Sequence, residues 1–358
     1  MNKLEILLKA AGKISREKNL NNLISILSNL AKDIIEVDRC SLFLIDEQKN
    51  ELYTIFAHGV KEIRIPITSG IAGYVVKTGK TYVTSDAYKS KFFNPEVDKI
   101  SGYTTRNILA VPIFDSRGRI IGVYQAINKL DDFNSVDIKL MKLIAEFAAA
   151  AIETQMLYEK IKSVHKKALI KLSKAAEYKD PESPNHFLRV GLISSLLGEK
   201  LGLDEEKCEL LTLASTMHDI GKIGIPDNIL QKSGRLEPDE WEIMKKHPII
   251  GYELLFDEES ELLQMAAIIA LEHHERWDGK GYPFGKRETE ISLWARIVSV
   301  VDNFDTLTTD KGDRESWSID AAINYMEIMK EKAFDPQIVD TFLSNIEKII
   351  EIKEKYKD

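Results

Sequence analysis

Cysteine is scarce in this sequence. The chain of 358 residues has two cysteines, Cys40 and Cys208, which lie far apart and lack the paired spacing of a zinc or redox site. Two cysteines in 358 residues are too few for a disulfide scaffold. We expect two ordinary buried thiols in a reducing compartment.

Long apolar runs and an excess of basic residues are also missing. No apolar run approaches the ~20 residues that cross a bilayer, and the N-terminus carries Glu5 and an amphipathic pattern where a secretory signal would have its apolar segment. Lysine and arginine total 49 against 57 acidic residues, a net charge of -8. This charge opposes DNA binding but permits a local cationic pocket for a small anion. We therefore expect a cytoplasmic protein that contacts neither DNA nor membrane.

The length and composition predict two folded domains. At ~150 residues per domain, 358 residues suggest two, and 44% hydrophobic with 30% charged residues is a globular composition. Apolar residues at helical spacing predict helices over 4–14 and 23–35. Short β-rich runs between turn residues predict strands over 41–45, 52–56, 82–84, 108–113 and 120–126, the last two as a hairpin.

This order of helix, strand meander and helix resembles a GAF domain over about residues 20–155. Residues 69–76 stand where that family has its mid-domain helix. The NKFDE signature of GAF domains associated with cyclic nucleotides is similar to Asn128, Lys129, Phe133 and Asp137, with Ile138 in place of its Glu. The resemblance implies an α+β sensor domain, an antiparallel sheet with flanking helices, and leaves its ligand unknown. Alternatively, Asn128 and Lys129 anchor a strand end to the next helix.

Glycine and proline are absent between Gly122 and Pro181, which predicts a long helix over about 136–176. Its apolar residues follow alternating steps of four and three, as in a coiled-coil seam interrupted by Thr154: Leu143, Phe147, Ala150, Leu157, Ile161, Val164 and Ala168. We expect a parallel homodimer joined along this helix, which would also carry a signal between domains. Alternatively, the early part of the helix packs on the GAF sheet and only the part after Thr154 is free.

Beyond Pro181 the β-rich runs disappear. Helical patterns between Gly, Pro, Asp and Ser predict an all-α domain with helices over 188–201, 205–217, 238–246, 249–255, 262–274, 293–307, 319–329 and 336–350. This half holds five of the seven histidines, beside acids: His186, His218, His247, His273 and His274. Mixed nitrogen and oxygen ligands favour a divalent transition metal such as iron or manganese. Two ions bridged by a carboxylate polarise a phosphoryl group and activate water.

Two motifs in this half carry a second resemblance. His218-Asp219 and Asp302 resemble the HD superfamily of metal-dependent phosphohydrolases, and the string from His273 to Pro283 is similar to the motif of its HD-GYP subgroup. The resemblance spans about residues 165–350 and implies a phosphodiesterase that opens cyclic di-GMP to pGpG, and to GMP if the second bond is cut. It implies metal ligands at His186, His218, Asp219, His247, His273, His274 and Asp302, with Asp219 as the bridge. Iron is the first choice and manganese the alternative, with two or three ions per chain.

Glu182 is a separate candidate ligand, four residues before His186. On a continuous helix the two side chains would share one face, and in the family an acid here accompanies a third metal. The alternative is a solvated turn residue, because Pro181 and Pro184 disfavour a continuous helix at this point.

Catalytic roles are expected for Asp219 and Lys222, since Lys222 lies one helical turn after His218 and can donate to a phosphate oxygen. Tyr282 either packs inward or touches the substrate. The resemblance also implies substrate contacts at Asp305, Lys311 and Arg314. Here the chain departs from the family pattern, with a lysine for an arginine and Gly-Asp for Pro-Tyr, which leaves substrate affinity and loop order open.

The predicted organisation is a GAF sensor over 1–155, a long helix over 136–176 that overlaps its end, and an HD-GYP domain over 177–358. We expect GAF-regulated hydrolysis of cyclic di-GMP. The alternatives are hydrolysis of another cyclic dinucleotide, an oxygenase of the wider superfamily, and a catalytically silent receptor. A diguanylate cyclase (GGDEF) or another signalling protein is a candidate partner, although this chain has no GGDEF-like signature itself.

Overall fold

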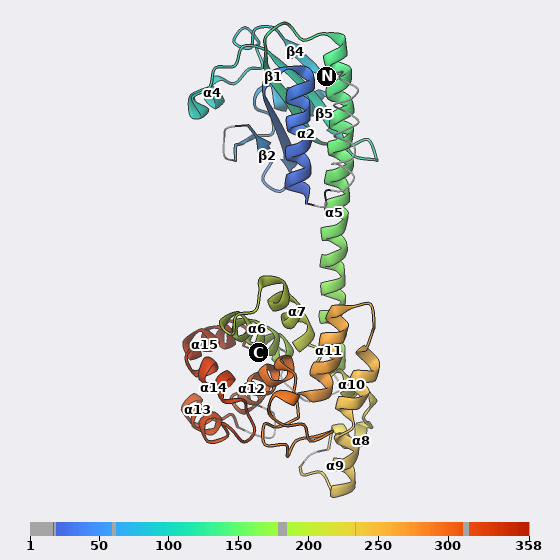
Figure 1. Ribbon diagram of the computed structural model, residues 1–358, viewed down its shortest axis with the longest axis vertical. Helices are drawn as coiled ribbons and strands as arrows, with labels where there is room; N and C mark the ends of the chain where they lie inside the picture. Colours follow the sequence, from blue (N-terminus) through green and yellow to red (C-terminus); the bar gives the residue numbers. More distant parts are fainter. Residues whose placement is uncertain are drawn as a thin grey trace. The chain divides into compact units, whose positions relative to one another are not determined.

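The computed structural model describes residues 17, 19–58, 62–177, 185–232, 234–310 and 315–357. It divides into two compact units, Met1–Lys162 and Ser163–Asp358. The first unit combines a sheet with helices, and the second is built from helices (Figure 1). The predicted fold class is therefore confirmed. Both cysteines are buried free thiols, as expected.

A six-stranded antiparallel sheet forms the centre of the first unit, with its strands in the order β3-β2-β1-β6-β5-β4. The strands are β1 (Val37–Asp46), β2 (Glu51–Ala57), β3 (Arg64–Pro66), β4 (Tyr82–Thr84), β5 (Ile108–Phe114) and β6 (Ile120–Lys129). All five predicted strands are present, and β5 and β6 form the predicted hairpin. The prediction lacks β3, in which Ile65 is the single apolar residue before Pro66 and a proline argues against a strand.

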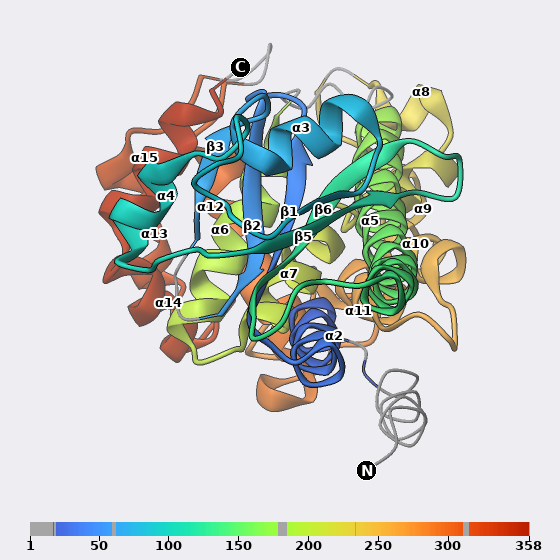
Figure 2. The ribbon, with the colours of Figure 1, turned by 90° about the horizontal axis from the view of Figure 1, so that it is seen from above.

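Alternating burial gives the sheet two apolar faces. Leu42 and Leu44 of β1 pack toward α2 (Leu20–Ile35) and α5 (Ser135–Glu177), whereas Phe43 between them packs toward α3 (Gly70–Thr78). Two helices thus cover one face and α3 covers the other (Figure 2). A short helix, α4 (Pro95–Ser101), follows β4 and is missing from the prediction.

Three of the four helices predicted for this unit are present in the structure. Those over 23–35 and 69–76 and the long helix over 136–176 are confirmed by α2, α3 and the 43-residue α5. The helix predicted over 4–14 lies outside the described residues.

The residues that resemble NKFDE join β6 to α5. Lys129 Nζ forms a buried ion pair with Asp137 in the first turn of α5. Asn128 accepts a hydrogen bond of 2.6 Å from the backbone N–H of Arg106, and Phe133 packs against the core beneath α2 and α5. These contacts favour the anchoring interpretation, in which Asn128 and Lys129 hold a strand end to the next helix.

The second unit is a helical domain around Phe304 and Phe342, whose rings meet edge to face. Its helices are α6 (His186–Lys200), α7 (Glu205–Ser215), η1 (Ile220–Gly224), α8 (Asp227–Leu230), α9 (Pro238–Met244), α10 (His247–Leu255), α11 (Glu261–Glu272), η2 (Glu288–Glu290), α12 (Leu293–Leu307), α13 (Ile319–Ile328), α14 (Pro336–Leu343) and α15 (Ile346–Lys355). The single helix predicted over 336–350 is wrong, because the chain turns at Ser344 and Asn345 between α14 and α15. Among the described helices, none is both long and apolar enough to span a membrane.

Candidate metal centre

Seven side chains of the second unit form two groups of potential metal ligands. Group A contains Asp219, His247, His273 and His274, and group B contains His186, His218 and Asp302. In each group the ligand atoms lie within 4.8 Å of one another. The structure therefore brings together every predicted ligand except Glu182, which lies outside the described residues.

Asp219 connects the two groups. Its Oδ1 is 3.3 Å from His247 Nε2 and 3.5 Å from His273 Nε2, whereas its Oδ2 is 3.4 Å from His218 Nε2. The Asp219 Oδ1 and His218 Nε2 atoms are buried, and neither has a hydrogen-bond partner in the described part of the chain. A carboxylate that turns one oxygen toward each group has the geometry of a bridge between two metal ions.

Asp302 on α12 completes group B. Its Oδ1 is 3.2 Å from His186 Nε2 and 3.8 Å from His218 Nε2. Group B therefore offers two imidazole nitrogens and one carboxylate, and group A offers three imidazoles and the shared Asp219. Mixed donor sets of this kind suit divalent transition metals.

Hydrogen bonds to backbone carbonyls fix the tautomer of three imidazoles. Three Nδ1 atoms donate to a carbonyl oxygen three residues earlier: His218 to Ser215 at 2.9 Å, His247 to Met244 at 2.8 Å and His273 to Ala270 at 2.9 Å. Each accepting carbonyl lies in the last turn of α7, α9 or α11, where helix carbonyls lack intrahelical partners. Donation from Nδ1 leaves the Nε2 lone pair for a metal ion.

Two Nε2 atoms of group A lie so close together that a positive charge between them would stabilise the arrangement. His247 Nε2 and His273 Nε2 are 3.5 Å apart, and both rings already donate from Nδ1. Two lone pairs at this distance repel unless a proton or a metal ion lies beside them. The residues present therefore fit a divalent metal.

Gly221 allows the segments that carry Asp219 and His247 to pack closely. A Cβ atom at Gly221 would lie 2.0 Å from the His247 carbonyl oxygen and 2.5 Å from the Gly251 backbone nitrogen. Only glycine lets η1, which begins directly after Asp219, pack on the start of α10. This backbone contact sets the spacing between Asp219 and His247.

Glu275 supports the Gly-Tyr-Pro loop, and the sequence prediction did not include it. Its buried carboxylate accepts hydrogen bonds from the backbone N–H groups of Phe284 at 2.7 Å and Lys286 at 3.0 Å. These bonds hold the loop so that Tyr282 stacks on His274, with ring centroids 4.7 Å apart and planes at 27°. The position of Glu275 directly after the His-His pair is the one sequence signal for this role.

Charges within the centre shift the pKa of its groups. Burial alone would raise the pKa of Asp219, but Lys222 and His218 hold it well below its usual value. Burial alone would lower the pKa of His218, whereas Asp219 and Asp302 raise it to about 9. Asp219 is therefore ionised at neutral pH, and a metal ion must displace a proton to bind His218.

Asp305, an expected substrate contact, lies beside group B. Its carboxylate is fully buried and accepts hydrogen bonds from His186 Nδ1 at 2.8 Å, from Arg189 Nε and Nη2 at 2.8 Å each, and from Lys353 Nζ at 2.9 Å. Both oxygens therefore have protein partners, and the substrate contact expected at Asp305 stays a prediction. Burial alone would raise the pKa of Asp305, but the bonds from His186 and Arg189 hold it well below its usual value. Asp305 thus orients His186.

The other predicted substrate residues have different outcomes. Lys222 Nζ lies 2.7 Å from Asp219 Oδ2, at the edge of group A. Tyr282 packs on His274 and also lines a cavity of about 400 Å³, and its contact with the substrate stays a prediction. Lys311 and Arg314 lie outside the described residues.

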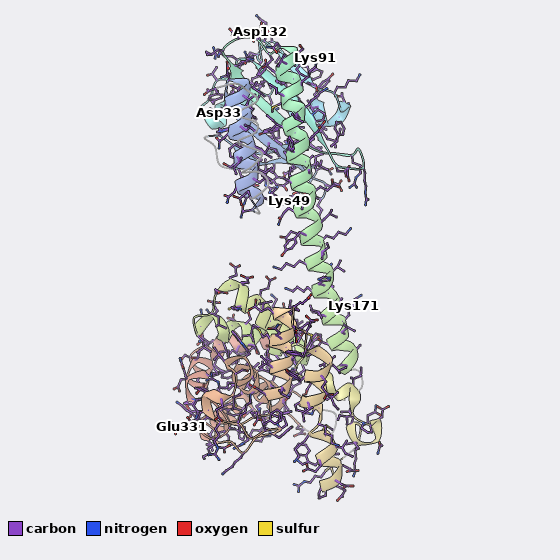
Figure 3. The ribbon with its side chains drawn as sticks, turned by 45° about the vertical axis from the view of Figure 1, so that its right-hand side comes forward. Asp33, Lys49, Lys91, Asp132, Lys171 and Glu331 are labelled. Atoms are coloured by element: carbon purple, nitrogen blue, oxygen red, sulfur yellow. The ribbon has the colours of Figure 1, made fainter. Side chains whose placement is uncertain are left out.

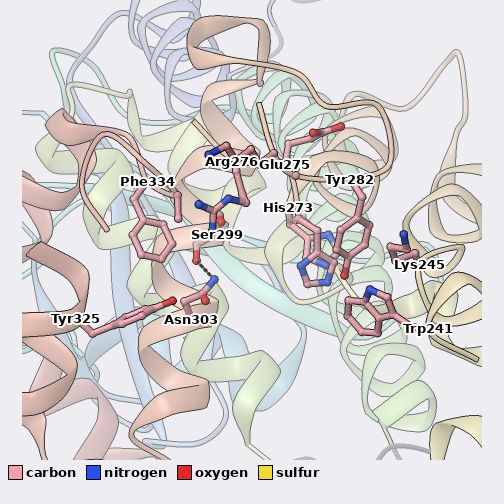
Figure 4. Close-up of a pocket in the computed structure, with 14 residues that line it drawn as sticks. Trp241, Lys245, His273, Glu275, Arg276, Tyr282, Ser299, Asn303, Tyr325 and Phe334 are labelled. Atoms are coloured by element: carbon pink, nitrogen blue, oxygen red, sulfur yellow. Dashed lines mark hydrogen bonds between the residues drawn. The ribbon is translucent and has the colours of Figure 1, made fainter. Parts of the chain in front are cut away.

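The cavity adjoins group A, since His273 and His274 are part of its wall (Figure 4). Further side chains of its wall are Trp241, Lys245, Asn303 and Tyr325, which the sequence prediction missed. They come from α9, the residue after it, α12 and α13, so no local sequence pattern connects them. Its volume is in the range of ligand-binding pockets, so the cavity is large enough for a small organic molecule beside group A.

Removing the bridge should empty the centre. We predict that Asp219→Ala lowers the bound metal from at least two ions per chain to one or none, because both groups lose their shared anion. Elemental analysis of the purified full chain checks this, with the exposed Asp320→Ala on α13 as a control that keeps its metal. Wild-type metal content in Asp219→Ala would contradict the bridging assignment.

Removing the charge on Asp305 should weaken metal binding through its effect on His186. We predict that Asp305→Asn lowers metal affinity about 10- to 100-fold, because His186 loses the carboxylate that orients it. Competition with a chelator measures this affinity, with the exposed Asp310→Asn as the control. Unchanged affinity in Asp305→Asn would refute the orienting role.

Comparison with known proteins places this geometry in a family. The chain matches the model of the GAF domain over residues 19–152 and that of the HD domain over residues 156–338. It is 41% identical over 197 residues to the cyclic di-GMP phosphodiesterase response regulator RpfG of Xanthomonas campestris pv. campestris, covering 54% of this chain and 52% of that protein. It is also 41% identical over 187 residues to a cyclic di-GMP phosphodiesterase of Thermotoga maritima, covering 52% and 51%.

A third relative matches more of the chain. The 3'3'-cGAMP-specific phosphodiesterase 2 of Vibrio cholerae is 30% identical over 262 residues, covering 72% of this chain and 50% of that protein. The chain spans about half the length of each of these curated relatives. The HD domain model covers about half of the chain, on the residues that hold both ligand groups. The chain therefore belongs to the HD domain family and carries a GAF domain before its HD domain.

Proposed function

We propose that this protein hydrolyses cyclic di-GMP to linear pGpG, and to GMP when the second phosphodiester bond is also cut. The observation that carries the proposal is Asp219, set between two histidine groups beside a cavity of about 400 Å³. Two relatives with 41% identity are named cyclic di-GMP phosphodiesterases, which supports this substrate.

The protein's own groups would bind and orient the phosphodiester. Divalent metal ions held by groups A and B would polarise the phosphoryl group of the substrate and lower the pKa of a bound water. Lys222, which is 13% exposed, offers a cation to a phosphate oxygen that develops charge. Burial and the charge of Asp219 raise the pKa of Tyr282, so its phenol stays protonated and can donate a hydrogen bond into the cavity.

The metal is proposed to be iron, with manganese as the alternative, because imidazole and carboxylate donors together suit both. Groups A and B would hold two ions. A third ion beside His186 would need Glu182 as its anchor.

A second candidate substrate is 3′3′-cGAMP. The relative that matches the largest share of this chain among those compared above is named for that compound. Both compounds present phosphodiesters to the same ligand groups and differ in one base, so the discrimination would come from the cavity wall.

Product analysis tests the activity. We expect the full chain, purified without oxygen and loaded with iron or manganese, to convert cyclic di-GMP to pGpG. Lys222→Met should lower kcat about 100-fold, because one donor to the phosphoryl oxygens is lost. Lys232→Met, which removes only an exposed partner of Glu240, should keep wild-type kcat.

Three results would contradict the proposal in different ways. Binding of cyclic di-GMP without turnover would favour the silent receptor. Turnover of 3′3′-cGAMP alone would favour the second candidate. Consumption of O₂ with an organic substrate would favour the oxygenase.

We further propose a parallel homodimer joined along α5. Met141, Ile144, Ala145, Ala148 and Ile152 of this helix pack on the sheet, so the early part of α5 is covered on that face. The seam residues lie on another face and are exposed, from 40% at Leu143 to 54% at Leu157, Ile161 and Val164. Figure 3 shows side chains projecting from α5, where Lys171 is labelled.

The proposed dimer would place two GAF domains at the start of a shared helix pair and thereby regulate hydrolysis. Its GAF ligand is unknown, and a diguanylate cyclase (GGDEF) is a candidate partner. Two buried free thiols support a reducing, cytoplasmic location.

A charge in the seam should break the dimer. We predict that Ile161→Glu converts a dimer to a monomer, because a buried unpaired carboxylate is costly. Sedimentation of the full chain measures the state, with Lys166→Glu, an exposed position outside the seam, as the control. A monomeric wild type would refute the proposal.

A further inference from the structure

Trp241 is a large aromatic side chain with no place in the hydrophobic core. It lies on α9, whose residues are all described and of which none is buried. Ile243 and Met244 of the same helix pack on the cluster around Ile229, whereas the Trp241 side chain is 43% exposed and forms part of the cavity wall. Core packing therefore does not account for an indole at this position.

The ring of Trp241 continues a row of rings that begins at the metal ligands. Tyr282 stacks on His274 of group A, and the centroid of Trp241 lies 6.0 Å from that of Tyr282 with the planes at 76°. Two rings that meet edge to face form a corner (Figure 4). A planar base can lie flat on the indole with its edge toward the phenol.

Polar groups in the same cavity wall suit the edge of a purine. Lys245 follows Trp241 by one helical turn, and its partner Glu242 is 67% exposed, so their ion pair is weak and exchangeable. A lysine can donate to the N7 and O6 acceptors of guanine. Arg276 is held by both oxygens of Asp278, at 2.8 and 3.1 Å, so it is less available than Lys245 to donate to a base.

We propose that Trp241 is the platform on which one guanine of the cyclic dinucleotide stacks, with Lys245 at its acceptor edge. The inference rests on the proposed function and assigns a base-recognition site beside the metal centre. Stacking acts on substrate binding and not on the reacting phosphate, so it is expressed in KM more than in kcat.

Steady-state kinetics on the metal-loaded full chain test this site. Trp241→Ala should raise KM for cyclic di-GMP about 5- to 150-fold, the range of one lost base–aromatic contact. It should leave metal content unchanged and kcat within about twofold. Trp241→Phe should restore most of the affinity, because a phenyl ring still offers a face for stacking. Phe256→Ala is the matched control, since Phe256 is 47% exposed and packs on Tyr252 away from the cavity.

Stopped-flow fluorescence provides a second readout. Mixing cyclic di-GMP with the wild type should quench indole emission, and Trp241→Phe, which keeps the other three tryptophans, should bind with little quenching.

The outcomes separate this inference from the proposed function. An active wild type with unchanged KM in Trp241→Ala would overturn the stacking site and leave the proposed function standing. Loss of metal or of helical content in Trp241→Ala would show a structural role and would also overturn it. A wild type that neither binds nor hydrolyses cyclic di-GMP would overturn both.

Discussion

The arrangement of the candidate metal centre depends on the carboxylate of Asp219, which directs one oxygen toward each ligand group. Asp219 turns Oδ1 toward His247 and His273 and Oδ2 toward His218 and Lys222. Bringing buried imidazoles and carboxylates this close costs desolvation and lone-pair repulsion, which cations between them offset. The arrangement is therefore understandable as a place for metal ions and difficult to understand as a structural core.

The fold stabilises this arrangement mainly through helix ends. Three histidines of groups A and B follow the last turns of α7, α9 and α11, whose terminal carbonyls accept from Nδ1. The fourth, His186, opens α6 and uses Asp305 instead, which is in turn paired with Arg189 and Lys353. The same backbone features that end the helices thus fix the tautomer of the ligands, and Gly221 permits the close packing between them.

The sequence predicted best where local chemistry is decisive. The resemblance of two strings to the HD and HD-GYP motifs pointed to the residues that groups A and B contain. Short β-rich runs between turn residues located the long strands of the sheet. The contacts of Asp305 with Arg189 and Lys353 could not be predicted, because its position three residues after Asp302 says nothing about its burial. Trp241, Asn303 and Tyr325 meet only through tertiary packing of α9, α12 and α13, so no spacing along the chain could connect them.

Anomalous diffraction from crystals of the anaerobically purified protein, recorded at the iron and manganese edges, tests the central claim most directly. The account predicts at least two peaks, one in group A and one in group B, with the Asp219 carboxylate between them. A single peak, or Asp219 bound to Lys222 alone with both histidine groups free of metal, would contradict it.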